Sequence, residues 1–287
     1  MKKIICLLLV LLAVSGCANK GYSRVTDGDA IIFKGPNKTY TKNDLYKQLK
    51  LSSQSQITED ILNEIAVGLN IDMSEIESEA DSMIEMYMEA GYEDVIISYY
   101  GSVEAYRQQY ISSLVLNKLA SYYVDVKFDE FVANDKPIKM QMVSFYDMET
   151  AEKFVKDVNG GKDFATAAKD NEYLYDCPVQ IYLDTYEYIP LEVKKYINET
   201  SVVGLSSIIE CTSSATDADG NLTENKTYYV LNIVNRDVKE FKDEYLETKA
   251  SDIEQTEVIE YLFSNHEIKF YDQDIYEIMK STYEVLQ

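Results

Sequence analysis

Residues 138–145 read IKMQMVSF, a short run in which apolar side chains recur at almost every second position. This length and alternation predict a β-strand. Two stretches with the apolar spacing of helices follow, at residues 151–158 and 163–170, and Gly160 and Gly161 separate them. A strand followed by two short helices predicts the beginning of a small mixed α/β unit.

Two further strands are predicted later in this unit, at residues 206–212 and 227–234. The polar loop between them contains Asp219-Gly220-Asn221, which is typical of a hairpin turn. A calcium loop is not predicted, because the spacing and the distal glutamate of such a site are missing. Upstream, Lys136-Pro137 interrupts a helical pattern and marks the beginning of the unit.

Helical patterns flank the unit on both sides. After a strand at residues 30–33 and a turn at residues 34–37, residues 39–131 are predicted to be helical. Helices are predicted to start at Thr41, which forms a capping box with Asp44, and at Thr58 and Ser102. Gly91 marks a break between helices. Residues 237–263 are again predicted to be helical, and a last helix ends near Leu286.

The order of these elements predicts an α+β protein with an inserted domain. The predicted parts are an N-terminal helical segment at residues 26–135, the α/β domain at residues 136–236 and a C-terminal helical segment at residues 237–287. Because the ends of a compact domain often lie close together, the two helical segments are expected to pack as one module around the insertion.

The first residues predict export. Lys2 and Lys3 precede an apolar run that is too short to span a membrane, and small residues follow it. Val14-Ser15-Gly16-Cys17 resembles the bacterial lipobox, which implies a signal peptide at residues 1–16, lipid on Cys17 and a linker at residues 17–25. The expected location is the extracytoplasmic face of the cell membrane. The alternative is an ordinary signal peptide that ends in a cysteine.

The composition narrows the class of partner. The 287 residues include 50 acidic and 27 basic ones, for a formal net charge of −23. This charge disfavours nucleic acid, whose phosphates need clustered basic residues, and flat adsorption on anionic lipid. It serves solubility or, alternatively, attracts basic client chains. The 25 tyrosines and the absence of tryptophan favour a binding protein, because tyrosine combines an apolar body with a polar tip.

The sequence has few cysteine and histidine residues that could bind a metal or act as nucleophiles. After loss of the signal peptide, Cys177 and Cys211 remain beside the lipidated cysteine, and they form either a disulfide or two free thiols. The one histidine, His266, follows a helix and is expected to be a surface or capping residue. No metal site and no cofactor are predicted.

The order of elements resembles that of extracytoplasmic foldases of the PrsA and SurA type, in which a helical chaperone module surrounds a parvulin-type peptidyl-prolyl isomerase domain. The matching motifs are IKMQMVSF followed by Glu149-Thr150-Ala151, then GKDFATAA at residues 161–168, VGLS at residues 203–206, YYVLNI at residues 228–233 and NHEIKFYD at residues 265–272. The resemblance implies an exported protein that assists the folding of others.

The same resemblance locates a degenerate isomerase site. Met142 and Tyr229 stand where parvulins carry their two histidines, and Cys177 is a candidate for the parvulin cysteine. Tyr188 and Val193 match the family's pocket-lining stretch, whereas its glycine-rich segment is missing between residues 170 and 188. We therefore expect isomerase activity to be lost.

Met83, Tyr87, Tyr106 and Tyr110 are the candidate client-binding residues of the helical segment, with a helix core as the alternative. The leading hypothesis is a membrane-anchored chaperone for unfolded or partly folded exported proteins, with a homodimer as a candidate assembly. The alternatives are an active isomerase with altered site residues and a non-enzymatic surface lipoprotein that binds one specific protein partner.

Overall fold

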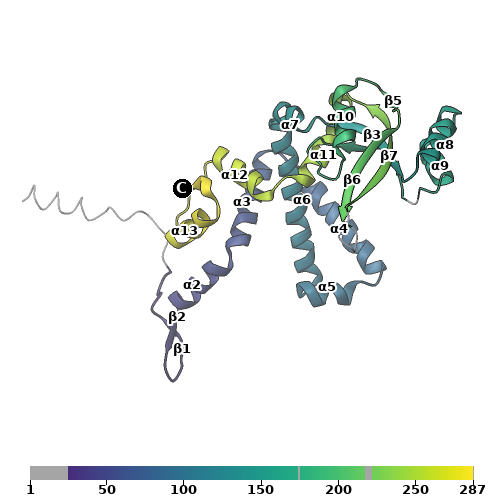
Figure 1. Ribbon diagram of the computed structural model, residues 1–287. Coiled ribbons are helices and arrows are strands. Elements are labelled where there is room, and N and C mark those ends of the chain that lie inside the picture. The colour runs from purple at the N-terminus through teal and green to yellow at the C-terminus, as the bar shows by residue number, and fades with distance from the viewer. Residues whose placement is uncertain (1–24, 174, 217–221, 287) are drawn as a thin grey trace, which may run out of the picture. The chain divides into compact units, whose positions relative to one another are not determined.

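The computed structural model describes residues 25–173, 175–216 and 222–286. The chain divides into two compact units. Unit 1 comprises Met1–Tyr123 and Ile253–Gln287, and unit 2 comprises Val124–Asp252. The first unit is therefore built from both ends of the chain, and the second is inserted between them (Figure 1). With helices throughout and one larger antiparallel sheet, the predicted α+β class with an insertion is confirmed.

Unit 1 consists of a hairpin and a set of helices. Its elements are β1 (Ile31–Lys34), β2 (Thr39–Thr41), α2 (Lys42–Ser52), α3 (Gln54–Gly68), α4 (Met73–Glu89), α5 (Glu93–Tyr100), most of α6 (Val103–Val126), α12 (Gln255–Asn265), α13 (Gln273–Thr282) and the 3₁₀ turn η2 (Glu284–Leu286). The predicted capping box is confirmed, because Thr41 accepts from the backbone of Asp44 while the Asp44 carboxylate accepts from the backbone of Thr41.

Two helix boundaries in unit 1 differ from the prediction. The second helix begins at Gln54 and not at Thr58, which is a buried residue within it. The short α5 was not predicted as a helix of its own. It lies between Gly91 and Gly101, whose φ angles of 80° and 81° are in the left-handed region that glycine adopts easily.

The two ends of the chain share the core of unit 1. The Tyr123 hydroxyl donates to the Glu257 carboxylate at 2.7 Å, and the Tyr123 and Tyr261 ring centroids are 4.6 Å apart. The Thr58 hydroxyl lies 3.3 Å from the Tyr283 hydroxyl. The C-terminal helices α12 and α13 thus complete the module that the N-terminal helices begin.

A buried ion pair fastens α2 to the start of α13. The Lys50 ammonium lies 2.9 Å from the Asp272 carboxylate and 2.8 Å from that of Asp274, and the Tyr46 hydroxyl also donates to Asp272. Burial by itself would raise the pKa of Asp272, but the bonds from Lys50 and from the Ile275 backbone lower this pKa overall.

We expect Lys50→Met to lower the free energy of unfolding by about 1–3 kcal/mol, because it leaves the buried Asp272 without its cation. Since the folded state lowers the pKa of Asp272, the stabilisation is present above the ordinary aspartate pKa. It is lost as the pH falls below the ordinary value of 3.8 and through the lowered one. Urea unfolding at several pH values tests this. The exposed variant Lys47→Met is the control, and equal stability of the two variants at neutral pH would contradict the expectation.

Unit 2 is a sheet with helices on both faces. Its elements are α7 (Phe128–Asp135), β3 (Ile138–Phe145), α8 (Met148–Asn159), α9 (Phe164–Asp170), β4 (Gln180–Tyr182), α10 (Leu191–Glu199), β5 (Gly204–Leu205), β6 (Ile209–Thr216), β7 (Leu222–Asn235), the 3₁₀ turn η1 (Val238–Phe241) and α11 (Lys242–Asp252). The strand order is β4-β3-β7-β5 with β6 also paired to β7, and every pairing is antiparallel.

The sheet separates two apolar clusters. Met140, Leu231 and Ile233 face one way and pack with Val193 and Ile197 of α10. Val143, Phe145 and Val230 face the other way and pack with α8 and α9. Figure 1 shows α8 and α9 on one side of the strands and α10 on the other. This alternation follows from the period of two along each strand.

The helices next to the sheet extend unit 2 beyond the predicted residues 136–236. In α11, the Tyr245 hydroxyl donates to the Asp135 carboxylate of α7 at 2.8 Å, and Lys139 of β3 forms an ion pair with Glu244. The continuous helix predicted over residues 237–263 is therefore split into η1, α11 and α12, because α11 belongs to unit 2 and α12 to unit 1. The predicted loop at Asp219-Gly220-Asn221 lies outside the described residues.

Candidate functional site

Strand register brings together the two residues predicted to stand in place of the parvulin histidines. On β3 and β7, Met142 is opposite Leu231 and Ser144 is opposite Tyr229, and opposite residues of an antiparallel pair point to the same face. Met142 and Tyr229 both pack, half-buried, against the cluster that contains Val193 of α10. Three of the predicted site residues thus lie on one face of unit 2, which we call the α10 face.

Cys177 does not join them. It is buried in the cluster with Phe154 and Phe164 on the opposite face of the sheet, and its backbone carbonyl accepts from Gln141 Nε2 at 2.8 Å. The cysteine on the α10 face is Cys211 of β6. Assigning Cys177 to the site is therefore wrong in this structure, because Cys177 lies in the loop before β4, and this loop places its side chain in the cluster with α8 and α9.

The disulfide alternative is also wrong. Both thiols are free and buried, and the sheet lies between the two clusters that contain them. Burial raises the pKa of Cys177, and burial together with the Glu192 carboxylate raises the pKa of Cys211 to about 11. A thiol that stays protonated at neutral pH is a poor nucleophile.

The α10 face has no group poised for proton transfer near neutral pH among the residues assigned to it. Burial raises the pKa of Tyr229 and that of Tyr182, so both phenols stay neutral. The single histidine belongs to unit 1, where it follows α12 and its Nδ1 lies 2.8 Å from the Leu262 carbonyl, as expected of a capping residue. The face offers apolar contact and hydroxyl groups for binding.

The rim of the α10 face carries exposed apolar side chains, of which only Tyr188 was predicted from the sequence. Tyr188 is exposed, and its ring stacks on that of Tyr186 with centroids 5.2 Å apart. Leu191, the first residue of α10, is 80% exposed and was missed, as was α10 itself. Pro190 directly before it was the available signal, because proline is common at the beginning of helices.

In unit 1, the candidate client-binding tyrosines do converge. The Tyr106 ring centroid lies 6.0 Å from that of Tyr87, 4.7 Å from that of Tyr100 and 6.3 Å from that of Tyr110. Tyr92 contacts Tyr87 edge-on. We call these five residues, together with the neighbouring Met86 and Tyr99, the tyrosine surface. It spans α4, the Gly91 turn, α5 and α6.

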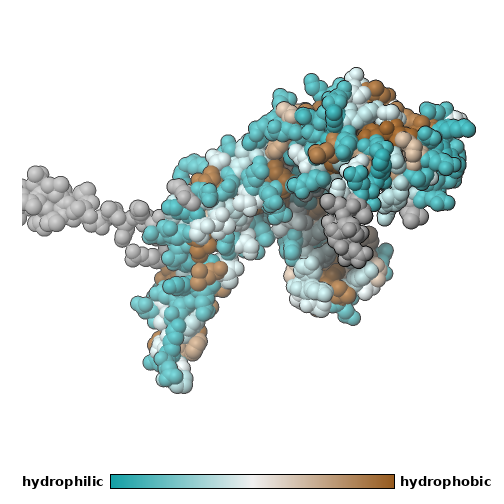
Figure 2. All heavy atoms as spheres, viewed as in Figure 1, coloured by the Kyte–Doolittle hydropathy of each residue, from teal (hydrophilic) through white to brown (hydrophobic). Residues whose placement is uncertain are grey.

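The tyrosine surface is open to solvent. Met86, Tyr92 and Tyr100 are exposed, and Tyr99 is 81% exposed, whereas Met83 and Tyr87 are half-buried. Figure 2 shows pale and hydrophobic brown atoms at the α5 end of unit 1. Burial raises the pKa of Tyr106 and that of Tyr110, so these phenols stay neutral hydrogen-bonding groups. The surface has an inner layer of packed rings and an outer layer that is free for contact.

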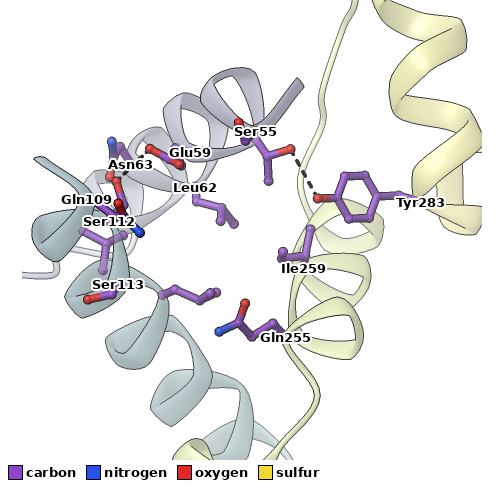
Figure 3. A pocket seen from close by; sticks show the side chains of 13 residues that line it. Ser55, Glu59, Leu62, Asn63, Gln109, Ser112, Ser113, Gln255, Ile259 and Tyr283 are labelled. Atoms are coloured by element: carbon purple, nitrogen blue, oxygen red, sulfur yellow. Dashed lines mark hydrogen bonds between the residues drawn. The ribbon is translucent and has the colours of Figure 1, made fainter. Parts of the chain in front are cut away.

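A cavity of about 270 Å³ lies between α3, α6 and α12 (Figure 3). Its floor is apolar, with Leu62 and Ile259, and its walls carry the amides Asn63, Gln109 and Gln255. Ser112 donates to the Glu59 carboxylate at 2.8 Å on one side. Amides above an apolar floor suit a short stretch of extended polypeptide, because they can bond its backbone while its side chains are buried.

Comparison with solved structures finds similar proteins over most of the chain. The foldase protein PrsA of Streptococcus pneumoniae is 18% identical with a TM-score of 0.46, and the match covers 88% of this chain and all of that one. PrsA of Bacillus subtilis is 19% identical with a TM-score of 0.41, over 90% of this chain and 99% of that one. The peptidylprolyl isomerase PrsA of Bacillus cereus is 14% identical with a TM-score of 0.43, over 91% of this chain and all of that one.

The resemblance to PrsA predicted from the sequence is therefore found again among solved structures, at low identity. No protein-family model matches the sequence. No curated protein matches it significantly.

Two absences are established for the described residues alone. None of their helices has both the length and the apolar character needed to cross a membrane. In the same part of the chain, no cluster of three or more histidine, cysteine or acidic side chains is arranged to hold a metal ion.

Proposed function

We propose that this chain is a membrane-anchored extracytoplasmic chaperone that holds exported proteins while they fold, without catalysing prolyl isomerisation. The tyrosine surface carries the proposal, because it gathers exposed aromatic and thioether side chains from α4, the Gly91 turn and α5 beside half-buried rings of α6. Aromatic rings give large contact areas at a low entropic cost, and methionine adapts to varied partners. Unfolded chains expose the apolar segments that such a surface binds.

The anchor is part of this proposal. Cys17 and the residues before it lie outside the described residues, so support comes from the sequence, where a cationic start, an apolar run and Ser15-Gly16-Cys17 occur in order. Each buried CH₂ of an acyl chain adds about 0.8 kcal/mol to the free energy of membrane binding, so several chains keep a protein on a bilayer. The intact mass of the mature chain tests the anchor, since acylation of Cys17 adds the mass of the lipid.

The proposed loss of catalysis is supported by the side chains of the α10 face. Rotation about a prolyl bond crosses a barrier of roughly 20 kcal/mol, and a catalyst must stabilise the twisted amide through preorganised polar groups. Here a thioether, a neutral phenol and a protonated thiol occupy the face: Met142, Tyr229 and Cys211. They retain an apolar surface on which a peptide can bind.

We expect the chain to leave the cis-to-trans rate of a prolyl peptide unchanged, because neither Met142 nor Tyr229 supplies an imidazole to polarise the amide. The same preparation is expected to suppress aggregation of a chemically unfolded protein. Tyr229→Phe and Cys211→Ser are matched variants that remove single polar groups. A clear rate gain that either variant abolishes would favour an active isomerase with altered residues.

The aggregation assay also separates the proposal from the remaining alternative. A chaperone suppresses aggregation of several unrelated unfolded proteins. A lipoprotein dedicated to one partner suppresses none of them and instead recovers a single protein in stoichiometric amount from an extract of its own cell envelope.

A further inference from the structure

The β1–β2 hairpin of unit 1 exposes an apolar strand. Ile31, Ile32 and Phe33 are 52%, 47% and 55% exposed, and the Phe33 ring stacks on Tyr40 with centroids 5.0 Å apart. Figure 1 shows the hairpin projecting from the start of α2. A two-stranded hairpin has no core of its own, so these side chains remain available to an external apolar phase.

Exposed lysines surround this apolar strand. Lys34 and Lys38 flank the turn, and Lys42 and Lys47 follow on α2. Asp44 is the one acidic residue between residues 30 and 49, and it is engaged in the cap of α2, with Lys38 at 3.9 Å. Asp27 and Asp29 lie at the base of the hairpin, before β1. In a chain with a net charge of −23, this is a local reversal of sign.

Apolar and aromatic side chains beside lysines fit the interface of a bilayer that contains anionic lipids. Aromatic rings settle at the level of the headgroups, and each lysine near an anionic surface is attracted to it. The remainder of the protein is acidic and is repelled by such a surface. This repulsion opposes flat adsorption of the protein, so the hairpin is the part that contacts the lipid surface.

The covalent distance to the proposed anchor is compatible with this contact. Cys17 precedes Ile31 by fourteen residues, and a chain of that length spans at most roughly 50 Å. Lys20 and Arg24 of the intervening sequence add positive charge. A hairpin confined so near a lipid-bearing cysteine meets the membrane at a high local concentration.

We infer that the β1–β2 hairpin docks into an anionic lipid surface, together with the lysines of the turn and of α2. This contact would fix the orientation of unit 1 relative to the membrane. This inference rests on the proposed anchor and adds a second, non-covalent contact to it. The ligand is the anionic headgroup layer together with the upper acyl region, which Ile31, Ile32 and Phe33 enter.

The test uses the acylated full chain. Because this chain has no tryptophan, one introduced by substitution can be observed by itself. Phe33→Trp places a single tryptophan in the hairpin, and Tyr146→Trp places one at an exposed position of unit 2 as the matched control. Each protein is added to phosphatidylcholine vesicles with brominated acyl chains, with and without phosphatidylglycerol. We expect blue-shifted and quenched emission from the tryptophan at position 33 in the vesicles with phosphatidylglycerol, and unchanged emission at position 146.

Charge reversal and added salt test whether the contact depends on attraction between the lysines and the headgroups. Lys34→Glu with Lys38→Glu, or added salt, is expected to abolish the quenching at position 33, because both remove the attraction to the headgroups. Equal emission at the two positions in all vesicles overturns the inference. A blue shift at position 33 that grows with protein concentration without vesicles overturns it as well and points to a second copy of the chain.

Failure of the anchor is recognised separately. A mature chain without acyl mass that is still quenched at position 33 removes the anchor and keeps the hairpin contact. An acylated chain whose tryptophan at position 33 is not quenched keeps the anchor and removes the hairpin contact.

Discussion

Replacing Asp135 by alanine is expected to lower the free energy of unfolding of unit 2 by about 3–5 kcal/mol. The residue is 1% exposed, and its carboxylate accepts from the Tyr245 hydroxyl at 2.8 Å and pairs with the Lys249 ammonium at 3.0 Å. Its backbone carbonyl also accepts from the Asp184 amide at 2.7 Å. Alanine would leave a buried phenol and a largely buried ammonium without their acceptor.

Asp135→Asn separates the contribution of the hydrogen bond from Tyr245 from that of the ion pair with Lys249. The amide oxygen still accepts from Tyr245, whereas the charge that pairs with Lys249 is lost, so an intermediate loss of stability is expected. Asp176→Ala is the control, because that carboxylate is exposed and its contact with Lys169 is 3.8 Å long. Urea unfolding followed by circular dichroism gives the three values. A loss for Asp135→Ala as small as that of the control would contradict the role assigned to this network.

Replacing Tyr99 and Tyr100 together by serine is expected to weaken binding of an unfolded client by about tenfold or more. Both rings are exposed on the tyrosine surface, so little of the core of unit 1 is disturbed. Truncating a tyrosine in a contact centre commonly costs about 2 kcal/mol, and two of them exceed the roughly 1.4 kcal/mol that corresponds to a factor of ten. Titration of a fluorescently labelled, permanently unfolded protein measures the change.

The control for this pair is Tyr271→Ser, which removes an exposed tyrosine of unit 1 outside the tyrosine surface. Unchanged circular dichroism of all variants shows that the fold is intact. If the control weakens binding as much as the double variant, the client contact is not specific to the tyrosine surface. If neither variant weakens it, the cavity of Figure 3 becomes the place to substitute next.

The local sequence determined those elements whose signals are short in range. Strand β3 has the bounds predicted from IKMQMVSF, the capping box of Thr41 and Asp44 starts α2, and Lys136-Pro137 separates α7 from β3. Each depends on neighbours within a few residues, through side-chain alternation, a cap or a proline. The order of helical and mixed segments was likewise sufficient to predict the inserted unit.

Only the tertiary structure decided which side chains meet. Strand β4, α5 and α10 are short elements with weak local signals, and burial of one face against the rest of the protein stabilises them. The register of β3, β6 and β7 places Cys211 on the same face as Met142 and Tyr229, whereas the loop before β4 places Cys177 on the other face. A shift of one residue would move each strand residue to the other face, and the register of β3 against β7 depends on pairing between segments far apart in the chain.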